Sequence, residues 1–300
     1  MTAAVRWLLS AAVVATVGAS IAVGTATAAP TASADRECAG RGVPVSKISI
    51  QLWTFADYVG FESDAATQAR LETVFAALSE MGYRNVEPFT FNGLTAEEYR
   101  ALLDKYDLKA SGEHTSIDEA TWDQTLADAK TLGLRYLGAG ATPSNFTTEQ
   151  QWIDYAEMLN RLGRRAQQRG LELMVHNHNW EFEQEFGDRT AYDILQQHTD
   201  PRYVTFQLDL YWVTFGGADP IDVLQRYGDR VELFHVKDMA TDRSIEIVGE
   251  GIIDFPAIFD EAGGGVRYYV VEHDPRFGDP TFDPFEAAQK GFDYLDCVTF

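Results

Sequence analysis

Eight short apolar segments recur along this chain, and each precedes a stretch with the periodicity of an amphipathic helix. The segments end near residues 53, 87, 114, 138, 176, 209, 235 and 272, at intervals of 24 to 38 residues. This spacing accommodates one β-strand and one helix per repeat. Strands are predicted over Ile48–Trp53, Asn85–Glu87, Lys109–His114, Tyr136–Gly138, Leu171–His176, Thr205–Asp209, Val231–Val236 and Tyr268–Glu272.

Strands that are hydrophobic on both faces, each followed by a helix, indicate a parallel sheet covered by helices. Eight such units predict an α/β fold, a single closed (β/α)₈ TIM barrel over residues 47–300. The alternative is an open doubly wound sheet. It fits less well, because no glycine-rich phosphate-binding loop follows the first strand.

Helix boundaries carry their own signals. Thr95 and Glu98 have the spacing of a capping box. Asp219 and Pro220 are an N-cap followed by proline at the first helical position. Helices are also predicted over Ala66–Met81, Thr148–Arg169 and Phe285–Leu295.

The first 34 residues differ from the rest of the chain. They contain one charged residue, Arg6, an apolar run over Leu8–Val23, and small residues in Ala-x-Ala patterns. This pattern predicts a cleaved secretory signal peptide over residues 1–34, a lead-in over 35–46 and a secreted protein. An uncleaved membrane anchor is the alternative, although the run is short for a span. Because exported proteins favour disulfides, Cys38 and Cys297 are a candidate bridge between the ends of the mature chain.

The chain is strongly acidic, with a formal net charge of −22. A protein of this charge repels phosphate backbones and anionic lipids. We therefore expect no nucleic-acid partner and, after signal removal, no membrane partner.

Six of the eight predicted strands end in an ionisable residue. In order, the strand ends present Trp53, Glu87, His114, Gly138–Gly140, His176 with His178, Asp209, His235 and Glu272. The carboxyl ends of barrel strands converge on one site. A mixed set of imidazoles and carboxylates suits Zn²⁺, Mn²⁺, Co²⁺ or Mg²⁺. We therefore predict that His176, Asp209, His235 and Glu272 encircle one divalent ion, the alternative for each being a hydrogen-bonded core residue.

Several segments together resemble the xylose-isomerase-like sugar phosphate isomerase/epimerase family over residues 47–300. They are ISIQLWTF, GYRNVEPF, ASGEHTSI, MVHNHNWEFE, FQLDLYWV, LFHVKDM, VGEGIIDFPAIF and YYVVEHD. The resemblance implies a (β/α)₈ barrel with one divalent ion held by Glu, Asp, His and Glu from the last four strands. Asp209, His235 and Glu272 match three of these ligands. His176 stands where many members have the first Glu, which is similar to the family's inosose-dehydratase-like branch.

The resemblance implies roles for further residues. Glu272 is expected to be both ligand and base, with Glu87 as a second proton-transfer group. Lys237 is expected to polarise a carbonyl, or else to form a salt bridge to Glu272 or Asp209. The expected substrate contacts are His114, His178, Glu181, Trp53 and Trp212.

The leading function hypothesis is a secreted isomerase or epimerase. It would act on a sugar or keto-sugar by proton abstraction next to a carbonyl, through an enediolate held by the metal. The alternative is a lyase or dehydratase that eliminates water or a glycosyl group from a 3-keto-sugar. An endonuclease-IV-like enzyme conflicts with the charge, and a non-catalytic sugar-binding barrel would lack the metal. The expected partner is a small carbohydrate without phosphate, and a homodimeric assembly is left open.

Overall fold

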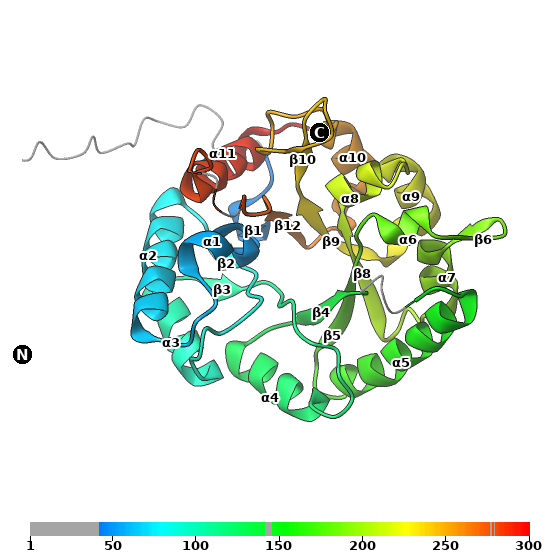
Figure 1. Cartoon of the computed structure of the whole chain (residues 1–300), viewed down its shortest axis with the longest axis horizontal. Coiled ribbons are helices and arrows are strands. Elements are labelled where there is room, and N and C mark those ends of the chain that lie inside the picture. The colour runs from blue at the N-terminus through cyan, green and yellow to red at the C-terminus, as the bar shows by residue number, and fades with distance from the viewer. Residues whose placement is uncertain (1–41, 142–145, 277, 279) are drawn as a thin grey trace, which may run out of the picture. The chain divides into compact units, whose positions relative to one another are not determined.

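Eight parallel strands form the wall of a barrel in the computed structural model, which describes residues 42–141, 146–276, 278 and 280–300 (Figure 1). Their order in the wall is β1-β2-β3-β4-β5-β8-β9-β12. The strands are β1 (Ile48–Ile50), β2 (Asn85–Val86), β3 (Lys109–Ala110), β4 (Tyr136–Gly140), β5 (Glu172–His176), β8 (Val204–Asp209), β9 (Val231–Val236) and β12 (Tyr268–Val271).

Two isolated parallel bridges complete the ring. Six strands form one continuous sheet from β1 through β12 to β4, and β2 pairs with β3 separately. Gln51 bridges to Glu87, and His114 bridges to Gly138, so that the pair β2-β3 joins both edges of the larger sheet. The predicted TIM barrel is therefore confirmed. Strands β1 and β3 end earlier than predicted, because Leu52–Phe55 turns into a 3₁₀ helix and only a single bridge follows Ala110.

Helices surround the strands (Figure 1). The outer helices are α2 (Ala65–Met81), α3 (Ala96–Lys105), α4 (Trp122–Leu132), α5 (Glu149–Gln167), α7 (Ala191–His198), α9 (Pro220–Tyr227), α10 (Phe255–Ala262) and α11 (Pro284–Cys297). The predicted capping box of Thr95 and Glu98 starts α3, and Asp219 caps α9 before Pro220. Along α5, Trp152, Leu159 and Leu162 are fully buried against the strands, and each such side chain contributes about 1.5–3 kcal/mol.

Short elements lie in the connections that follow β1, β5, β8 and β9. They are α1 (Ala56–Val59), α6 (Trp180–Glu183), α8 (Leu210–Phe215) and the antiparallel pairs β6 (Glu185–Phe186) with β7 (Arg189–Thr190) and β10 (Asp238–Met239) with β11 (Ile245–Glu246). Helix α6 begins four residues after β5, and α8 follows β8 directly. These elements therefore fix the side chains that follow the two strands.

The beginning of the described chain lies against its end. The backbone N–H groups of Gly42 and Val43 donate to the carbonyls of Asp296 and Leu295 in α11. Cys297 is disulfide-bonded, whereas Cys38 and the predicted signal peptide over residues 1–34 lie outside the described residues. Within the described part of the chain, no helix combines the length and the apolar character needed to cross a membrane.

A buried carboxyl lies behind the barrel wall. Glu113, at the end of the third strand segment, is 6% exposed. Burial, with a smaller contribution from Asp128, raises the pKa of Glu113 to about 8. The folded protein therefore keeps a proton that the unfolded chain releases near pH 4.5, so folding stability falls as the pH rises between these values.

Replacing Glu113 with glutamine is expected to remove this pH dependence. Each pH unit between about 5 and 8 costs the wild type up to about 1.4 kcal/mol through this group. Chemical denaturation at pH 5.5 and pH 7.5 measures the effect. The stability lost between the two pH values should be smaller in Glu113→Gln than in the wild type, and equal losses would show that Glu113 is ionised in the folded protein at both.

Candidate active site

A cavity of about 280 Å³ opens at the carboxyl ends of the strands. It is lined by Gln51, Trp53, Phe89, His114, His176, His178, Trp212, Lys237, Glu272 and Asp274. Side chains alternate across a strand, so residues two apart share a face. Leu233, His235 and Lys237 therefore follow one another up the inner face of β9, from an apolar layer to the cavity.

His235 lies beneath the cavity floor and is fully buried. Its Nδ1 is 2.9 Å from Glu272 Oε2 and 3.8 Å from Asp209 Oδ2. Its Nε2 is 2.6 Å from Glu87 Oε1. Burial alone would lower the pKa of His235, but the carboxylates of Glu272 and Glu87 raise it to about 10.

The two carboxylate oxygens of Asp209 differ, because one accepts a hydrogen bond and the other does not. Its Oδ1 caps α8 by accepting a hydrogen bond from Trp212 N at 2.8 Å. Asn177 fixes its backbone, because Asn177 Oδ1 accepts from Asp209 N at 2.9 Å. Its Oδ2 is buried and has no hydrogen-bond partner. Burial raises the pKa of Asp209 to about 7.

These donors form a compact triad. One ligand atom from each of Asp209, His235 and Glu272 lies within 4.8 Å of the others. Two carboxylates and one imidazole are a donor set that a divalent cation accepts. A cation would also bind Asp209 Oδ2, which is buried without a hydrogen bond, a costly state for a carboxylate oxygen. The residues therefore fit a divalent ion.

His176 does not join that triad. Its donor atoms group instead with those of His114 and His235, and its Nδ1 lies 3.2 Å from Gln207 Oε1. Three of the four predicted ligands, Asp209, His235 and Glu272, thus form one triad, whereas His176 belongs with His114 to a second triad that shares His235. Burial, followed by the neighbouring His235, lowers the pKa of His176 well below its usual range, so its imidazole is neutral and able to bind a metal.

Glu87, predicted to transfer a proton, is fully buried and does not line the cavity. Its carboxylate accepts from Gln51 Nε2 at 2.8 Å and from Gln207 Nε2 at 2.7 Å, in addition to its contact with His235. Burial would raise the pKa of Glu87, but the imidazoles of His235 and His114 lower it. The geometry therefore fits a residue that orients His235, in the way that outer carboxylates orient metal-binding histidines.

Lys237 lines the cavity and forms salt bridges with neighbouring carboxylates. A salt bridge was the alternative to the predicted role of polarising a carbonyl. Its Nζ is 3.1 Å from Glu272 Oε2 and 2.8 Å from Asp274 Oδ1. It also lies 5.0 Å from the ring centre of Trp212. Burial alone would lower the pKa of Lys237, but Glu272 and Asp274 raise it, so the ammonium stays protonated. Burial likewise raises the pKa of Glu272, but Lys237 and His235 outweigh it and hold that pKa below its usual range.

Of the predicted substrate contacts His178 and Glu181, only His178 lines the cavity. The imidazole of His178 lines the cavity and stacks on Trp180, with ring centres 4.1 Å apart. Burial, with Lys237, lowers the pKa of His178 to about 3. Glu181 is fully buried behind this loop, where its Oε2 accepts from His178 N at 2.8 Å. The expected substrate contact by Glu181 therefore has no support in the geometry, and Glu181 instead fixes the backbone of His178.

The remaining substrate predictions agree with the position of the cavity. Trp53, Trp212 and His114 line it. His114 Nε2 lies 2.7 Å from Gln207 Oε1. The glycine that ends β4 makes room for an imidazole, since a Cβ on Gly140 would lie 2.9 Å from the ring of His178.

Three inner residues were not predicted from the sequence: Gln51, Gln207 and Asp274. Gln207 precedes Asp209 by two positions and Asp274 follows Glu272 by two, so strand parity alone places them on the same face. Gln51 directly follows β1, lines the cavity and donates a hydrogen bond to Glu87. Strand parity could therefore have identified these residues. The two glutamines were overlooked because a neutral amide in an apolar strand does not by itself indicate a catalytic or metal-binding role.

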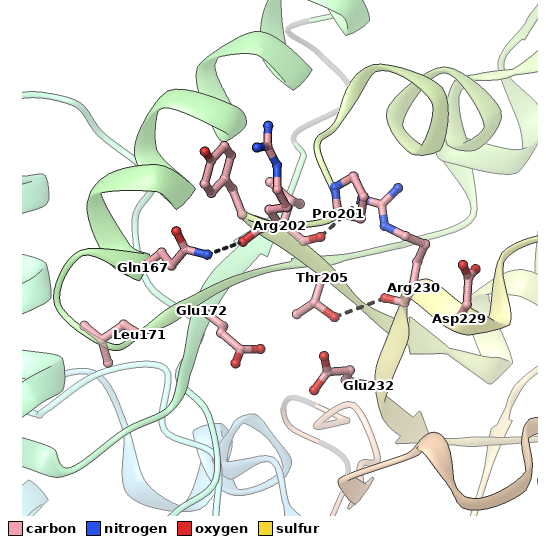
Figure 2. Close-up of a pocket in the computed structure, with 11 residues that line it drawn as sticks. Gln167, Leu171, Glu172, Pro201, Arg202, Thr205, Asp229, Arg230 and Glu232 are labelled. Carbon is pink, nitrogen blue, oxygen red and sulfur yellow. Dashed lines mark hydrogen bonds between the residues drawn. The ribbon is translucent and has the colours of Figure 1, made fainter.

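A second cavity, of about 230 Å³, lies at the opposite end of the barrel (Figure 2). It is lined by the first residues of β5, β8 and β9, among them Glu172, Thr205 and Glu232. Beside it, Gln167 Nε2 donates a hydrogen bond to the carbonyl of Arg202, and Thr205 Oγ1 donates to the carbonyl of Arg230 (Figure 2). This end of a TIM barrel serves stability rather than catalysis, so we assign the active site to the first cavity.

Comparison with known proteins places the chain in a family. The sequence profile of the xylose isomerase-like TIM barrel family matches residues 75–295. The chain belongs to this family. The resemblance inferred from the strand-end motifs is thereby confirmed.

Individual relatives of this xylose isomerase-like barrel differ in activity. Inosose dehydratase of Geobacillus thermodenitrificans is 29% identical over 171 residues, which are 49% of this chain and 55% of that enzyme. The chain thus matches about half the length of these curated relatives. A sugar phosphate isomerase/epimerase of Parabacteroides distasonis shares the fold, with a TM-score of 0.71, 22% identity, and coverage of 84% of this chain and 98% of that one. The IolI protein, solved with a bound zinc atom, has a TM-score of 0.63, 16% identity, and coverage of 84% and 98%.

Proposed function

We propose that this protein is a secreted, divalent-metal-dependent lyase. It removes a proton next to the carbonyl of a neutral keto-sugar or keto-polyol and expels water from the adjacent carbon. One observation carries the proposal: Glu272 and Asp274, the carboxylates that line the cavity, both follow β12, whereas the β3 and β5 side presents the imidazoles of His114, His176 and His178.

Carboxylates on one side of a cavity suit elimination. Epimerisation needs one proton-transfer group on each face of the carbon. Elimination needs one base: the C–H electron pair forms the new C=C bond, the neighbouring C–O bond breaks, and the departing hydroxide takes a proton to leave as water. The same carboxyl group can accept the first proton and return it to the leaving oxygen on the same face.

The chain's residues divide these tasks. Asp209, His235 and Glu272 would hold the ion, with His176 beside them. When bound, a divalent ion polarises a carbonyl oxygen and lowers the pKa of the adjacent C–H. Asp274 lies outside the ligand triad, and its side chain is 29% exposed. Burial raises the pKa of Asp274 despite the nearby Lys237, which makes Asp274 our candidate base.

The charge of the cavity favours an uncharged substrate. Among the described residues that line it, Lys237 is the one cationic side chain, and two lining carboxylates already pair with it. A phosphate group would meet the same carboxylates without a cation of its own. The similarity to inosose dehydratases further supports a ring ketone as substrate.

Isomerisation or epimerisation remains the second candidate. It is favoured by His178, whose Nδ1 is buried without a hydrogen-bond partner at the cavity wall. This imidazole would have to supply the proton on the second face.

Product analysis in D₂O tests the proposed lyase. We expect the Mn²⁺-loaded protein to convert an inosose or a related keto-sugar to a product that has lost one water. Chelation should abolish the reaction, and added Mn²⁺ should restore it. Asp274→Asn should lower kcat by about 10²- to 10⁴-fold, because it removes the proton acceptor. Deuterium uptake at otherwise unchanged composition would favour the isomerase, and an inert protein without metal would favour a sugar-binding barrel.

A further inference from the structure

An aromatic surface extends from the cavity toward solvent on the side of β1 and β2. We call Trp53, Phe61 and Phe89 the aromatic shelf. Trp53 and Phe89 line the cavity, and their ring centres are 5.1 Å apart. Phe61 lies 5.9 Å from Trp53 and 6.4 Å from Phe89. Because Phe61 is 57% exposed, the shelf begins inside the cavity and ends in solvent.

The backbone that carries Phe61 is held in place. Arg70 Nε donates to Val59 O at 2.8 Å, and Asn92 Nδ2 donates to Gly60 O at 3.2 Å. Gly93 has φ of +80°, and a Cβ there would lie 2.5 Å from Ser63 Cβ, so the loops after β1 and β2 pack closely. A ring that is already positioned costs little conformational entropy when a ligand binds it.

The size and chemistry of the cavity limit what fits inside. A volume of about 280 Å³ lies just below the usual range for small-molecule pockets, and suits one sugar ring. A larger ligand must extend past the rim. Lys237, Asp274 and Glu272 make one wall ionic, whereas the shelf offers aromatic faces on which an apolar ring face stacks. Exposed apolar surface that continues from a binding cavity marks a recognition surface.

We propose that the aromatic shelf binds the second ring of a glycoside whose first ring occupies the cavity. The substrate class is then a neutral two-ring keto-glycoside, rather than a free monosaccharide. The second ring is an aromatic aglycone or a neighbouring sugar, both of which present an apolar face to Trp53 and Phe61. This inference rests on the proposed function, because it takes the cavity to be the site of the reacting ring.

Binding of unreactive probes tests the shelf separately from catalysis. Methyl β-glucoside, 4-nitrophenyl β-glucoside and cellobiose lack a ring ketone, so the proposed elimination cannot occur on them. Isothermal titration of the Mn²⁺-loaded mature protein should show the aryl glucoside, the disaccharide or both binding about 2- to 10-fold more tightly than the methyl glucoside. Which of the two gains affinity identifies the second ring.

Two variants sharpen the test. Phe61→Ala should reduce the two-ring preference toward one. Tyr58→Ala is the matched control, because Tyr58 lies in the neighbouring α1, is 38% exposed and packs on Phe285 instead of the shelf. It should keep the preference. The inference is overturned by equal affinity for one-ring and two-ring probes, by no binding of any probe, or by a preference that survives Phe61→Ala.

The outcomes distinguish this inference from the proposed function. Loss of water from a one-ring ketone, together with no two-ring preference, would retain the lyase and reject the shelf. A two-ring preference that depends on Phe61, without any metal-dependent reaction, would retain the shelf and reject the lyase. Self-association that is lost in Phe61→Ala, in the absence of two-ring preference, would identify the shelf as a contact between copies of the chain and reject the inference.

Discussion

Replacing Asp209 with asparagine is expected to abolish stoichiometric binding of a divalent ion and to lower kcat by about 10³-fold or more. The Oδ2 of Asp209 is buried without a hydrogen bond beside His235 and Glu272. Substitution replaces an anionic oxygen with an amide at the centre of the donor triad, and a neutral amide is a much poorer ligand for Zn²⁺ or Mn²⁺. Elemental analysis of the purified protein measures the bound metal directly.

The fold should survive this substitution. The amide oxygen of asparagine can still accept the hydrogen bond from Trp212 N that caps α8. Asp219→Asn is a matched control, because Asp219 caps α9 through a 2.8 Å bond from Ile221 N and does not line the cavity. Asp219→Asn should keep the full metal content. A stoichiometric ion retained in Asp209→Asn would place the metal elsewhere and remove the basis of the proposed reaction.

Glu87→Gln is expected to lower the free energy of unfolding by about 3–5 kcal/mol, the cost of breaking a buried ion pair. The carboxylate accepts bonds from Gln51, Gln207 and His235 at full burial. A glutamine has only one acceptor oxygen, so at least one buried donor would face an N–H group. In the metal-free protein, the imidazole of His235 would also lose one of its two carboxylate contacts.

Glu113→Gln is the matched control for Glu87→Gln, because it makes the same substitution at a buried glutamate that is not part of an ion pair. Glu113 is also a buried glutamate, but its pKa of about 8 keeps it protonated at neutral pH. Its replacement removes the cost of keeping that proton at pH 7, so Glu113→Gln should keep or raise the free energy of unfolding at this pH, measured by the same denaturation experiment. Similar losses in both variants would mean that packing, rather than the ion pair, explains the effect.

Metal affinity gives a second measurement on the same variant. If Glu87 orients His235, Glu87→Gln should weaken metal binding by about 10- to 100-fold. A purely structural role would lower stability and leave the affinity of the folded protein unchanged.

The regular spacing of the strand ends was sufficient to predict the barrel. Parallel strands in a closed barrel are buried on both faces, so each appears as a continuous apolar run, and each must be followed by a helix that returns the chain. The same rule placed His176, Asp209, His235 and Glu272 at one end of the molecule. Helix boundaries were predictable where the caps are local, as at Thr95 and Asp219.

Depth within the barrel was not predictable from the strand ends. Glu87 and Lys237 both follow apolar strands, yet Glu87 lies beneath His235 and Lys237 faces the cavity. Strands that tilt around a barrel stagger their ends, so equivalent positions in the repeats do not reach equivalent heights. Glu181 illustrates a further difficulty, because the short helix α6 turns its carboxylate away from the cavity and toward the backbone of His178.

The sequence by itself thus determined the architecture, the end of the barrel that carries the chemistry, and the residue types available there. These depend on patterns of two and of about 3.6 residues that a linear chain displays directly. Only the tertiary structure decided which groups meet: that His235 belongs to two donor triads, that Gln51 and Gln207 hold Glu87 beneath it, and that Asp274 joins Glu272 in the cavity wall. The physical reason is that hydrogen bonds and ion pairs act over about 3 Å, whereas the strands that supply these partners are far apart in the sequence, up to 148 positions for Glu87 and His235.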